Sequence, residues 1–271
     1  MTAIIFDGKV ASDAIAADLQ AEITQLGLKP KLIDFAIEPD DRSLLYMQTK
    51  QTRARSLGIE LDIRSLEDVT MLEAKEAVQR AVADPKIHGV MLQLPLPIGY
   101  STVQLIQLIP LTKDVDGMNF VARDDGFAPA TPAAVMEILR LHDVNLADQT
   151  VALIGQGPLV GQPLAILLHQ AGAVVSLADE HTLELTELIR ECKVVISAAG
   201  QPKLITADMI QDGAIVIDVG IAVENGKPSS DVDFESVRHK ASFITPPTGG
   251  VGPMTVIELM RNVVEAAKQQ S

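Results

Sequence analysis

A short apolar run that breaks into three glycines constrains the fold of this chain more than any other feature. The run is Val151–Ile154, and the glycines are Gly155, Gly157 and Gly161. A glycine at the end of a buried strand permits a tight turn, a second lets the backbone approach an anion, and a third lets the next helix pack closely. Free N–H groups at the start of that helix can then face a phosphate. The spacing therefore indicates a strand, a phosphate-binding loop and a helix.

A second apolar run, Val174–Ala178, ends at Asp179 and Glu180. These acids follow the glycines by roughly the 20 residues at which a carboxylate can accept hydrogen bonds from an adenosine ribose. Two alternatives stay open, because three glycines also occur in ordinary tight turns and the two acids can simply begin a helix capped by Thr182. The combination favours a dinucleotide site.

Helical and strand-like segments alternate along the chain, which is typical of an α/β fold with mainly parallel sheets covered on both faces. Apolar spacing predicts helices at residues 9–26, 43–57, 69–82, 101–109, 131–141 and 255–268. It predicts strands at residues 32–37, 59–63, 89–92, 151–154, 174–178, 194–196 and 214–217. Thr131 is expected to cap its helix, and Thr255 with Glu258 is expected to form a capping box. Each later strand should be preceded by a helical segment.

The chain has 271 residues, more than the ~100–200 residues of a usual domain, so we expect two lobes. The first is an N-terminal α/β lobe of residues 1–118, which the C-terminal helix 253–271 rejoins. Residues 119–142 form a connecting segment and helix. Residues 143–252 form a Rossmann-type cofactor lobe.

Composition excludes several classes of partner. A net charge of −14, 3% aromatic residues and no tryptophan argue against binding of nucleic acid. No window approaches the ~18 apolar residues of a membrane span, and the first residues lack a basic stretch followed by an apolar core. The single cysteine, Cys192, excludes an internal disulfide and a multi-cysteine metal site. We therefore expect a cytoplasmic protein with no membrane partner and no metal.

Five short motifs occur in a characteristic order. They are Tyr46–Lys50 (YMQTK), Gln93–Pro97 (QLPLP), Lys113–Gly117 (KDVDG), Ile217–Gly220 (IDVG) and Gly249–Thr255 (GGVGPMT). In this order the chain resembles the bacterial methylenetetrahydrofolate dehydrogenase/cyclohydrolase family, commonly called FolD, over nearly its full length. The resemblance implies oxidation of methylenetetrahydrofolate by hydride transfer to a nicotinamide cofactor, and then hydrolysis of the methenyl product to formyltetrahydrofolate. It also implies that one cleft between the lobes serves both steps and that the enzyme is a homodimer.

The resemblance assigns roles to four side chains. Tyr46 and Lys50 are four residues apart and therefore share one face of a helix. Beside a ligand, desolvation can lower the pKa of a lysine and suit it to proton transfer, although an isolated pair of this kind is usually a solvated surface pair. By resemblance, Lys50 is the general acid/base of hydrolysis, Tyr46 packs against the aminobenzoyl ring, Gln93 holds the amine, and Asp116 accepts hydrogen bonds from the pterin. Gln93 can alternatively cap a loop, and Asp116 can serve only its turn.

The remaining site residues are also implied by the resemblance. Further substrate contacts are expected from Ser43, Leu94, Gly250 and Pro253. Cofactor contacts are expected from Gly155, Gln156, Gly157, Val160, Gly161, Asp179, Glu180, Thr131 and Ile221. The glycines from Gly249 to Gly252 can alternatively form a flexible loop.

Some positions depart from the family pattern. Gln156 and Gly157 stand where the family usually has the Arg and Ser that serve the extra phosphate of NADP, and Asp179 and Glu180 replace a neutral or basic pair. A carboxylate accepts ribose hydroxyls but repels a phosphate. We therefore expect NAD to be preferred, although NADP is the family default. Ala130 and Thr248 replace a cysteine and a proline, with small effects expected on the substrate site.

Two rival functions remain at this point. The altered glycine loop could belong to a folate-binding or regulatory protein with an impaired cofactor site. The two lobes could also belong to a different dehydrogenase, such as a shikimate-type enzyme. The motifs that carry Lys50, Gln93 and Asp116 argue against both.

Overall fold

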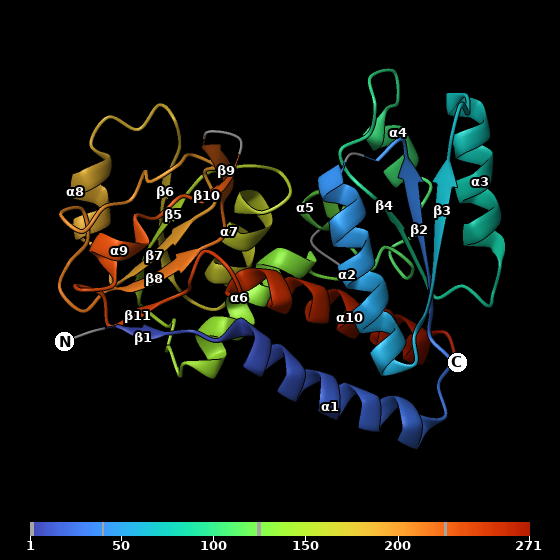
Figure 1. Cartoon of the computed structure of the whole chain (residues 1–271), viewed down its shortest axis with the longest axis horizontal. Coiled ribbons are helices and arrows are strands. Elements are labelled where there is room, and N and C mark those ends of the chain that lie inside the picture. Colours follow the sequence, from blue (N-terminus) through green and yellow to red (C-terminus); the bar gives the residue numbers. More distant parts are fainter. Residues whose placement is uncertain (1–2, 40, 124–125, 225–226) are drawn as a thin grey trace. The chain divides into compact units, whose positions relative to one another are not determined.

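The computed structural model describes residues 3–39, 41–123, 126–224 and 227–271, which divide into two compact units (Figure 1). We call Asp13–Ala130 together with Val256–Ser271 the Lys50 unit, and Met1–Ser12 together with Thr131–Thr255 the glycine-loop unit. Helices α1 (Gly8–Leu26) and α10 (Val251–Gln269) contribute residues to both. The expected two-lobed α/β fold, with the last helix returning to the first lobe, is confirmed. Within the described residues, no helix is long and apolar enough to cross a membrane.

The Lys50 unit is built on a parallel sheet of order β3-β2-β4. Its strands are β2 (Lys31–Ile37), β3 (Glu60–Leu66) and β4 (Gly89–Leu92). Its further helices are α2 (Asp41–Leu57), α3 (Met71–Ala83), α4 (Thr102–Ile106) and α5 (Phe120–Arg123). Strand β2 lies in the middle, which explains its nearly continuous apolar sequence KLIDFAI. Asp34 is the one acid in that strand.

Helices cover this sheet through small and branched side chains. Ala74, Val78 and Ala81 of α3 belong to the same buried cluster as Ile33 and Phe35 of β2. The capping box of Thr70 and Glu73 sets the start of α3. Helix α4 is shorter than the nine residues expected, with the Ser101 side chain as its N-cap.

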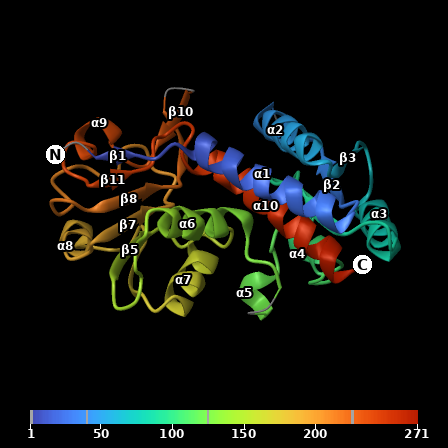
Figure 2. The ribbon, with the colours of Figure 1, turned by 90° about the horizontal axis from the view of Figure 1, so that it is seen from below.

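The C-terminal part of α10 belongs to the Lys50 unit and contacts its loops and α1. Lys268 of α10 pairs with Glu22 of α1 at 2.9 Å, and the two helices run side by side here (Figure 2). Asn262 Nδ2 donates hydrogen bonds to the carbonyls of Val115 and Ala128, both at 2.9 Å. The last helix therefore orders the loops that follow β4.

The glycine-loop unit contains a parallel six-stranded sheet of order β1-β11-β8-β7-β5-β6 and an antiparallel pair, β9 and β10. The strands are β1 (Ile4–Ile5), β5 (Thr150–Ile154), β6 (Val174–Ala178), β7 (Val194–Ser197), β8 (Ile215–Asp218), β9 (Ile221–Glu224), β10 (Lys227–Ser230) and β11 (Phe243–Ile244). The helices are α6 (Ala130–Leu141), α7 (Gly161–Gln170), α8 (Leu185–Arg190) and α9 (Phe234–Val237).

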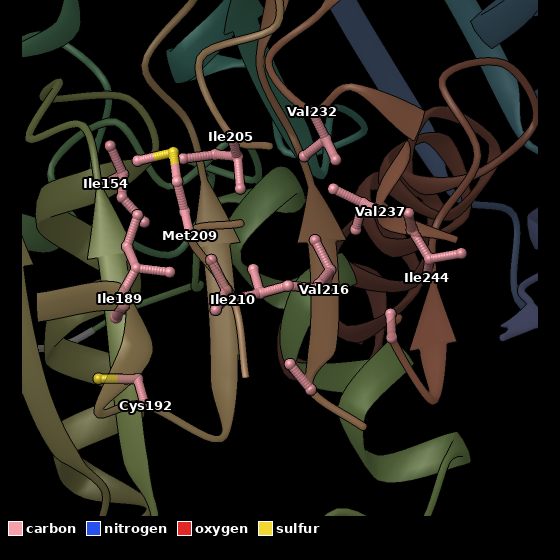
Figure 3. Close-up of a cluster of buried hydrophobic side chains, with 14 of the residues drawn as sticks. Ile154, Ile189, Cys192, Ile205, Met209, Ile210, Val216, Val232, Val237 and Ile244 are labelled. Carbon is pink, nitrogen blue, oxygen red and sulfur yellow. The ribbon is translucent and has the colours of Figure 1, made fainter. Parts of the chain in front are cut away.

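An apolar cluster holds this unit together, and Figure 3 shows its members. Its members include Ile154 of β5, Val216 of β8 and Ile244 of β11, together with Ile189 of α8 and Val237 of α9. All five side chains are at most 2% exposed. This packing fixes the strands whose carboxyl ends carry the glycine loop and Asp179.

Four further details differ from the expectations. Residues 1–12 group with the glycine-loop unit, because β1 pairs with β11. Helix α6 begins at Ala130, so Thr131 lies inside its first turn and is not the cap. Helix α10 begins at Val251, so Thr255 forms no capping box; its hydroxyl donates to the Val251 carbonyl at 3.3 Å. Turns, not a helix, occupy residues 201–214 before β8.

Candidate active site

The amine of Lys50 is held by two side chains inside the Lys50 unit. Lys50 lies on α2, and its side chain is 0% exposed. Nζ donates to Asp34 Oδ2 at 2.6 Å and to Gln93 Oε1 at 2.8 Å. An ammonium this deeply buried requires partners of this kind, because burial without them would disfavour its charge.

Strand register brings these partners together. Strands β2 and β4 pair in parallel with Asp34 beside Met91, and the Gln93 N–H extends the ladder to the Phe35 carbonyl at 2.8 Å. Met91 Sδ lies 3.8 Å from the Lys50 amine. Gln93 thus sits at the carboxyl end of β4, where ligand-binding residues of parallel sheets collect.

Tyr46 lies one turn before Lys50 on the same helix, as its spacing predicts. The Lys50 amine is 5.0 Å from the centre of the Tyr46 ring, within range of a cation–π contact. Burial raises the pKa of the Tyr46 hydroxyl, and the nearby carboxylates of Asp116 and Asp34 raise it further. The phenol therefore stays neutral and offers a ring surface and a hydroxyl.

Asp116 belongs to the same electrostatic cluster. Burial raises the pKa of its carboxyl to about 7; the Lys50 charge opposes this shift, whereas Asp114 and Asp34 add to it. The side chain is only partly buried, unlike that of Asp34. It can accept hydrogen bonds as a carboxylate above neutral pH and gains a proton below it.

Asp114 and Gly117 shape the turn that carries Asp116. Asp114 accepts hydrogen bonds from Met118 N at 3.1 Å, Asn119 N at 2.8 Å and Asn119 Nδ2 at 3.1 Å, which gives it a structural role. Gly117 has φ +66°, and a Cβ there would lie 2.5 Å from the Phe127 carbonyl oxygen. Only glycine fits this position without a shift of the backbone.

The other expected substrate residues fall in both units. Ser43 Oγ donates to the Leu94 carbonyl at 3.4 Å, and Gln93 Nε2 donates to the same carbonyl at 3.0 Å. Gly250 immediately precedes α10 and Pro253 lies in its first turn, both in the glycine-loop unit. A Cβ on Gly250 would lie 2.5 Å from the Pro246 carbonyl oxygen, so this loop is closely packed.

The glycine loop has the geometry that its sequence predicts. Gly155 has φ +96°, and a Cβ there would lie 2.3 Å from the Ala198 carbonyl oxygen. A Cβ on Gly161 would lie 2.0 Å from the Gly155 carbonyl oxygen, whereas one on Gly157 would meet nothing within 4 Å. The first and third glycines therefore serve the turn and the helix packing, and the second leaves the backbone open to a ligand.

The start of α7 fits a pyrophosphate. Its N-cap residue, Val160, provides no side-chain hydrogen bond to the helix. N–H groups of the first turn can therefore face an anion. Gln156 Nε2 donates to the carbonyls of Leu153 at 3.3 Å and Gly155 at 3.2 Å, so its neutral amide folds back on the loop.

Asp179 follows the strand next to the glycine loop. Strand β6 pairs with β5, and Gly155 N donates to the Ala178 carbonyl at 2.8 Å. The Asp179 carboxylate is exposed and accepts from His181 N at 2.9 Å and from Thr182 Oγ1 at 3.3 Å. The alternative in which the acids begin a helix is wrong, because α8 begins only at Leu185.

Three further residues are expected to contact the cofactor. Glu180 is exposed, with its carboxylate 3.6 Å from His181 Nε2. Thr131 Oγ1 lies 3.4 Å from the hydroxyl of Thr255. Ile221 opens β9, and its side chain lies outside the described part of the structure.

Sequence reasoning missed two residues that shape the Lys50 site. Asp34 is the ion-pair partner of Lys50, and the available signal was an acid within an apolar strand. Asn262 anchors the carbonyl of Val115, next to Asp116. Nothing local in α10 marks Asn262, because its partners are more than 130 residues away in the chain.

Comparisons with known proteins agree with these features. Residues 6–116 match the family model "Tetrahydrofolate dehydrogenase/cyclohydrolase, catalytic domain", and residues 129–271 match its "NAD(P)-binding domain". The chain is 38% identical to the Bifunctional protein FolD of Nautilia profundicola, over 97% of each chain.

Solved structures show the same similarity. The bifunctional enzyme FolD of Campylobacter jejuni has a TM-score of 0.93 and 34% identity, with 99% of each chain covered. The Trypanosoma brucei enzyme, solved with NADP and an inhibitor, has a TM-score of 0.93 and 30% identity, covering 99% of this chain and 98% of that one. The buried Lys50 cluster, the glycine loop and these similarities lead to one conclusion: the chain belongs to the tetrahydrofolate dehydrogenase/cyclohydrolase family.

Proposed function

We propose that this chain oxidises methylenetetrahydrofolate to methenyltetrahydrofolate with a nicotinamide cofactor and hydrolyses the product to formyltetrahydrofolate. The observation that carries this proposal is the buried amine of Lys50, which Gln93 and Asp34 hold beside Tyr46 in a chain of this family. An amine fixed by two acceptors next to an aromatic ring is suited to proton transfer at a flat, cationic substrate.

We assign the folate to one unit and the dinucleotide to the other. The Lys50 unit binds the folate, with Asp116 accepting hydrogen bonds from the pterin and Tyr46 packing against the aminobenzoyl ring. We assign Ser43 and Leu94 to this folate site as well. The glycine-loop unit binds the dinucleotide at Gly155, Gly157 and Gly161 and the first turn of α7.

Hydride transfer needs position more than side-chain chemistry. When bound, a nicotinamide cofactor would supply the acceptor for the hydride of the folate's bridge carbon. The residues of the chain hold the two reactants in register and need not remove a proton. Hydrolysis does need proton transfer, and we assign that task to Lys50, with Gln93 fixing its amine.

We further propose a preference for NAD over NADP. The neutral Gln156 amide is folded onto its own loop, so no cation from this residue meets a ribose phosphate. The exposed Asp179 carboxylate follows β6, next to the glycine loop. It suits the hydroxyls of an unphosphorylated ribose and repels a phosphate.

The proposal includes a homodimer in the cytoplasm. Val174 and Leu177 are 54% and 51% exposed on β6, an edge strand of the six-stranded sheet. Apolar side chains on an open sheet edge support association through the glycine-loop unit. A single, buried cysteine suits a reducing compartment.

One assay tests the proposed function. The purified chain is given methylenetetrahydrofolate with NAD or with NADP, and methenyl formation, reduced cofactor and formyl product are followed separately. We expect all three products, with a higher kcat/KM for NAD than for NADP. Absence of methenyl product with either cofactor would contradict the dehydrogenase assignment. An equal or higher kcat/KM with NADP would contradict only the cofactor preference.

A further inference from the structure

Asp34 is an unusual residue for the middle of a central strand. The other side chains of β2 from Leu32 to Ile37 are apolar and buried, and the Asp34 side chain itself is 0% exposed. Its Oδ2 contacts Lys50 at 2.6 Å, whereas its Oδ1 has no hydrogen-bond partner among the described residues. A buried carboxylate with one oxygen unsatisfied is costly, so its pairing with Lys50 is the feature that makes Asp34 tolerable here.

The hydrogen bonds of the amine limit what Lys50 can do. An ammonium has three N–H donors, and Asp34 and Gln93 accept two of them. Among the described residues, the third contacts a weak acceptor, Met91 Sδ at 3.8 Å. Of the three contacts this is the weakest, and so the one that a ligand can most readily replace. A neutral amine could accept a proton from water, whereas an ammonium donates, and a carboxylate at 2.6 Å is an acceptor suited to an ammonium.

We propose that Asp34 is a positioning residue that keeps Lys50 in its ammonium form, so that Lys50 enters the hydrolysis as a proton donor. This inference rests on the proposed hydrolysis of a methenyl bridge. Lys50 of α2 is then the acid of the hydrolysis, and Asp34 of β2 is the residue that keeps it charged.

The proton balance of this step is complete. Water adds to the cationic bridge carbon and releases one proton to solvent, which leaves a neutral hydroxylated adduct. The bond from that carbon to N5 then breaks, and its electron pair stays on N5, which takes a proton from Lys50. The carbonyl forms as the hydroxyl proton passes to the amine, so the ammonium is restored. The overall reaction consumes one water and releases one proton.

Other titratable groups act on the same amine. Tyr46 lies on α2, the helix that also carries Lys50, and Asp116 lies in the loop after β4. Burial raises the pKa of the Asp34 carboxyl, and the charge and hydrogen bond of Lys50 act in the opposite direction. Tyr46 stays neutral and Asp116 is only partly buried, so Asp34 is the fully buried counter-charge in contact with Lys50.

The test is the pH profile of hydrolysis in the Asp34→Asn variant, which keeps the shape of the side chain and removes its charge. We expect the alkaline loss of hydrolysis to begin about one pH unit or more lower than in the wild type, with hydride transfer much less affected. Asp62→Asn on the neighbouring strand β3 is the control, because Asp62 is half exposed and pairs with Arg64. An unmoved alkaline limb, or faster hydrolysis at neutral pH, would overturn the proposal.

A double variant tests whether Asp34 acts through Lys50 or independently of it. In a Lys50→Ala background, adding Asp34→Asn should cause no further loss of hydrolysis, and a further loss would overturn the proposal. If Asp34→Asn does not fold, the proposal is tested by the pH profile of hydrolysis by the wild type, after subtraction of the uncatalysed rate. A fall at alkaline pH agrees with a donor, and a continuous rise contradicts it. Absence of any hydrolysis by the wild type would instead refute the proposed function.

Discussion

Asn262 Nδ2 donates a hydrogen bond to the carbonyl oxygen of Val115 at 2.9 Å, and so ties helix α10 to the residue before Asp116. The same amide group reaches the Ala128 carbonyl at 2.9 Å. One side chain from the last helix therefore satisfies two carbonyls of the loops in the Lys50 unit. The position of Asp116 depends on this helix although the two residues are far apart in sequence.

Removal of this amide should loosen the Asp116 turn. We expect Asn262→Ala to lower the free energy of unfolding by about 1–3 kcal/mol, because two carbonyls lose their partner. The KM for the folate should rise as well. Urea denaturation and initial rates check both effects. Asn145→Ala, at an exposed loop position, is the control. Equal stability of the two variants would contradict this account of the turn.

The glycine loop offers a matched pair of variants. Gly155→Ala should destabilise the fold by about 1–3 kcal/mol or more, because φ is +96° and the new Cβ would lie 2.3 Å from the Ala198 carbonyl oxygen. Gly157→Ala should fold normally, since nothing lies within 4 Å of its Cβ, but should weaken binding of the dinucleotide. Thermal denaturation and cofactor titration measure these effects. Unimpaired cofactor binding by Gly157→Ala would show that the ligand does not approach this backbone.

The cofactor preference should depend on the charge of Asp179. Asp179→Asn keeps an oxygen that can accept from His181 N and Thr182 Oγ1, but it removes the charge. We expect kcat/KM with NADP to rise about tenfold relative to NAD, because repulsion of the phosphate is lost. Asp212→Asn, with a side chain that is 93% exposed elsewhere in the same unit, should leave the ratio unchanged. An unchanged ratio in Asp179→Asn would place the ribose away from this carboxylate.

Folate binding should weaken at acid pH. Burial raises the pKa of Asp116 to about 7, so the carboxyl is protonated below that pH and ionised above it. Only the ionised form accepts on both oxygens, so the KM for methylenetetrahydrofolate in the dehydrogenase assay should rise as pH falls from about 8 to about 6. Asp116→Asn should have a high KM that does not change over this range. A wild-type KM that stays constant would exclude Asp116 as the acceptor.

The sequence predicts the elements whose signals are local. The β5 run and its three glycines have an unambiguous order, and they fold as a strand, a loop and helix α7. Strand β1 has only two residues and no pattern of its own, because its pairing with β11 is set by tertiary contacts. The capping box expected at Thr255 did not form, since the helix had already begun at Val251.

The site shows the same division between local and long-range signals. Tyr46 and Lys50 share a helix face through their spacing, and Gln93 follows a strand that the sequence marks clearly. Asp34 can be identified as the partner of Lys50 only from the folded structure. There, the register of β2 and β4 and the packing of α2 bring Asp34, Gln93 and Lys50 together. A charge within an apolar strand was the signal, but the sequence does not say which residue neutralises it.

The role of Lys50 in hydrolysis is tested by Lys50→Ala, with the two activities of the chain measured separately on the same preparation. We expect hydrolysis of the methenyl folate to fall ~100-fold or more, because a positioned proton donor is lost, while hydride transfer is much less affected. Lys86→Ala, at an exposed lysine of the same unit, should retain both activities. Equal retention, or equal loss, of the two activities in Lys50→Ala would contradict the assignment of hydrolysis to this amine.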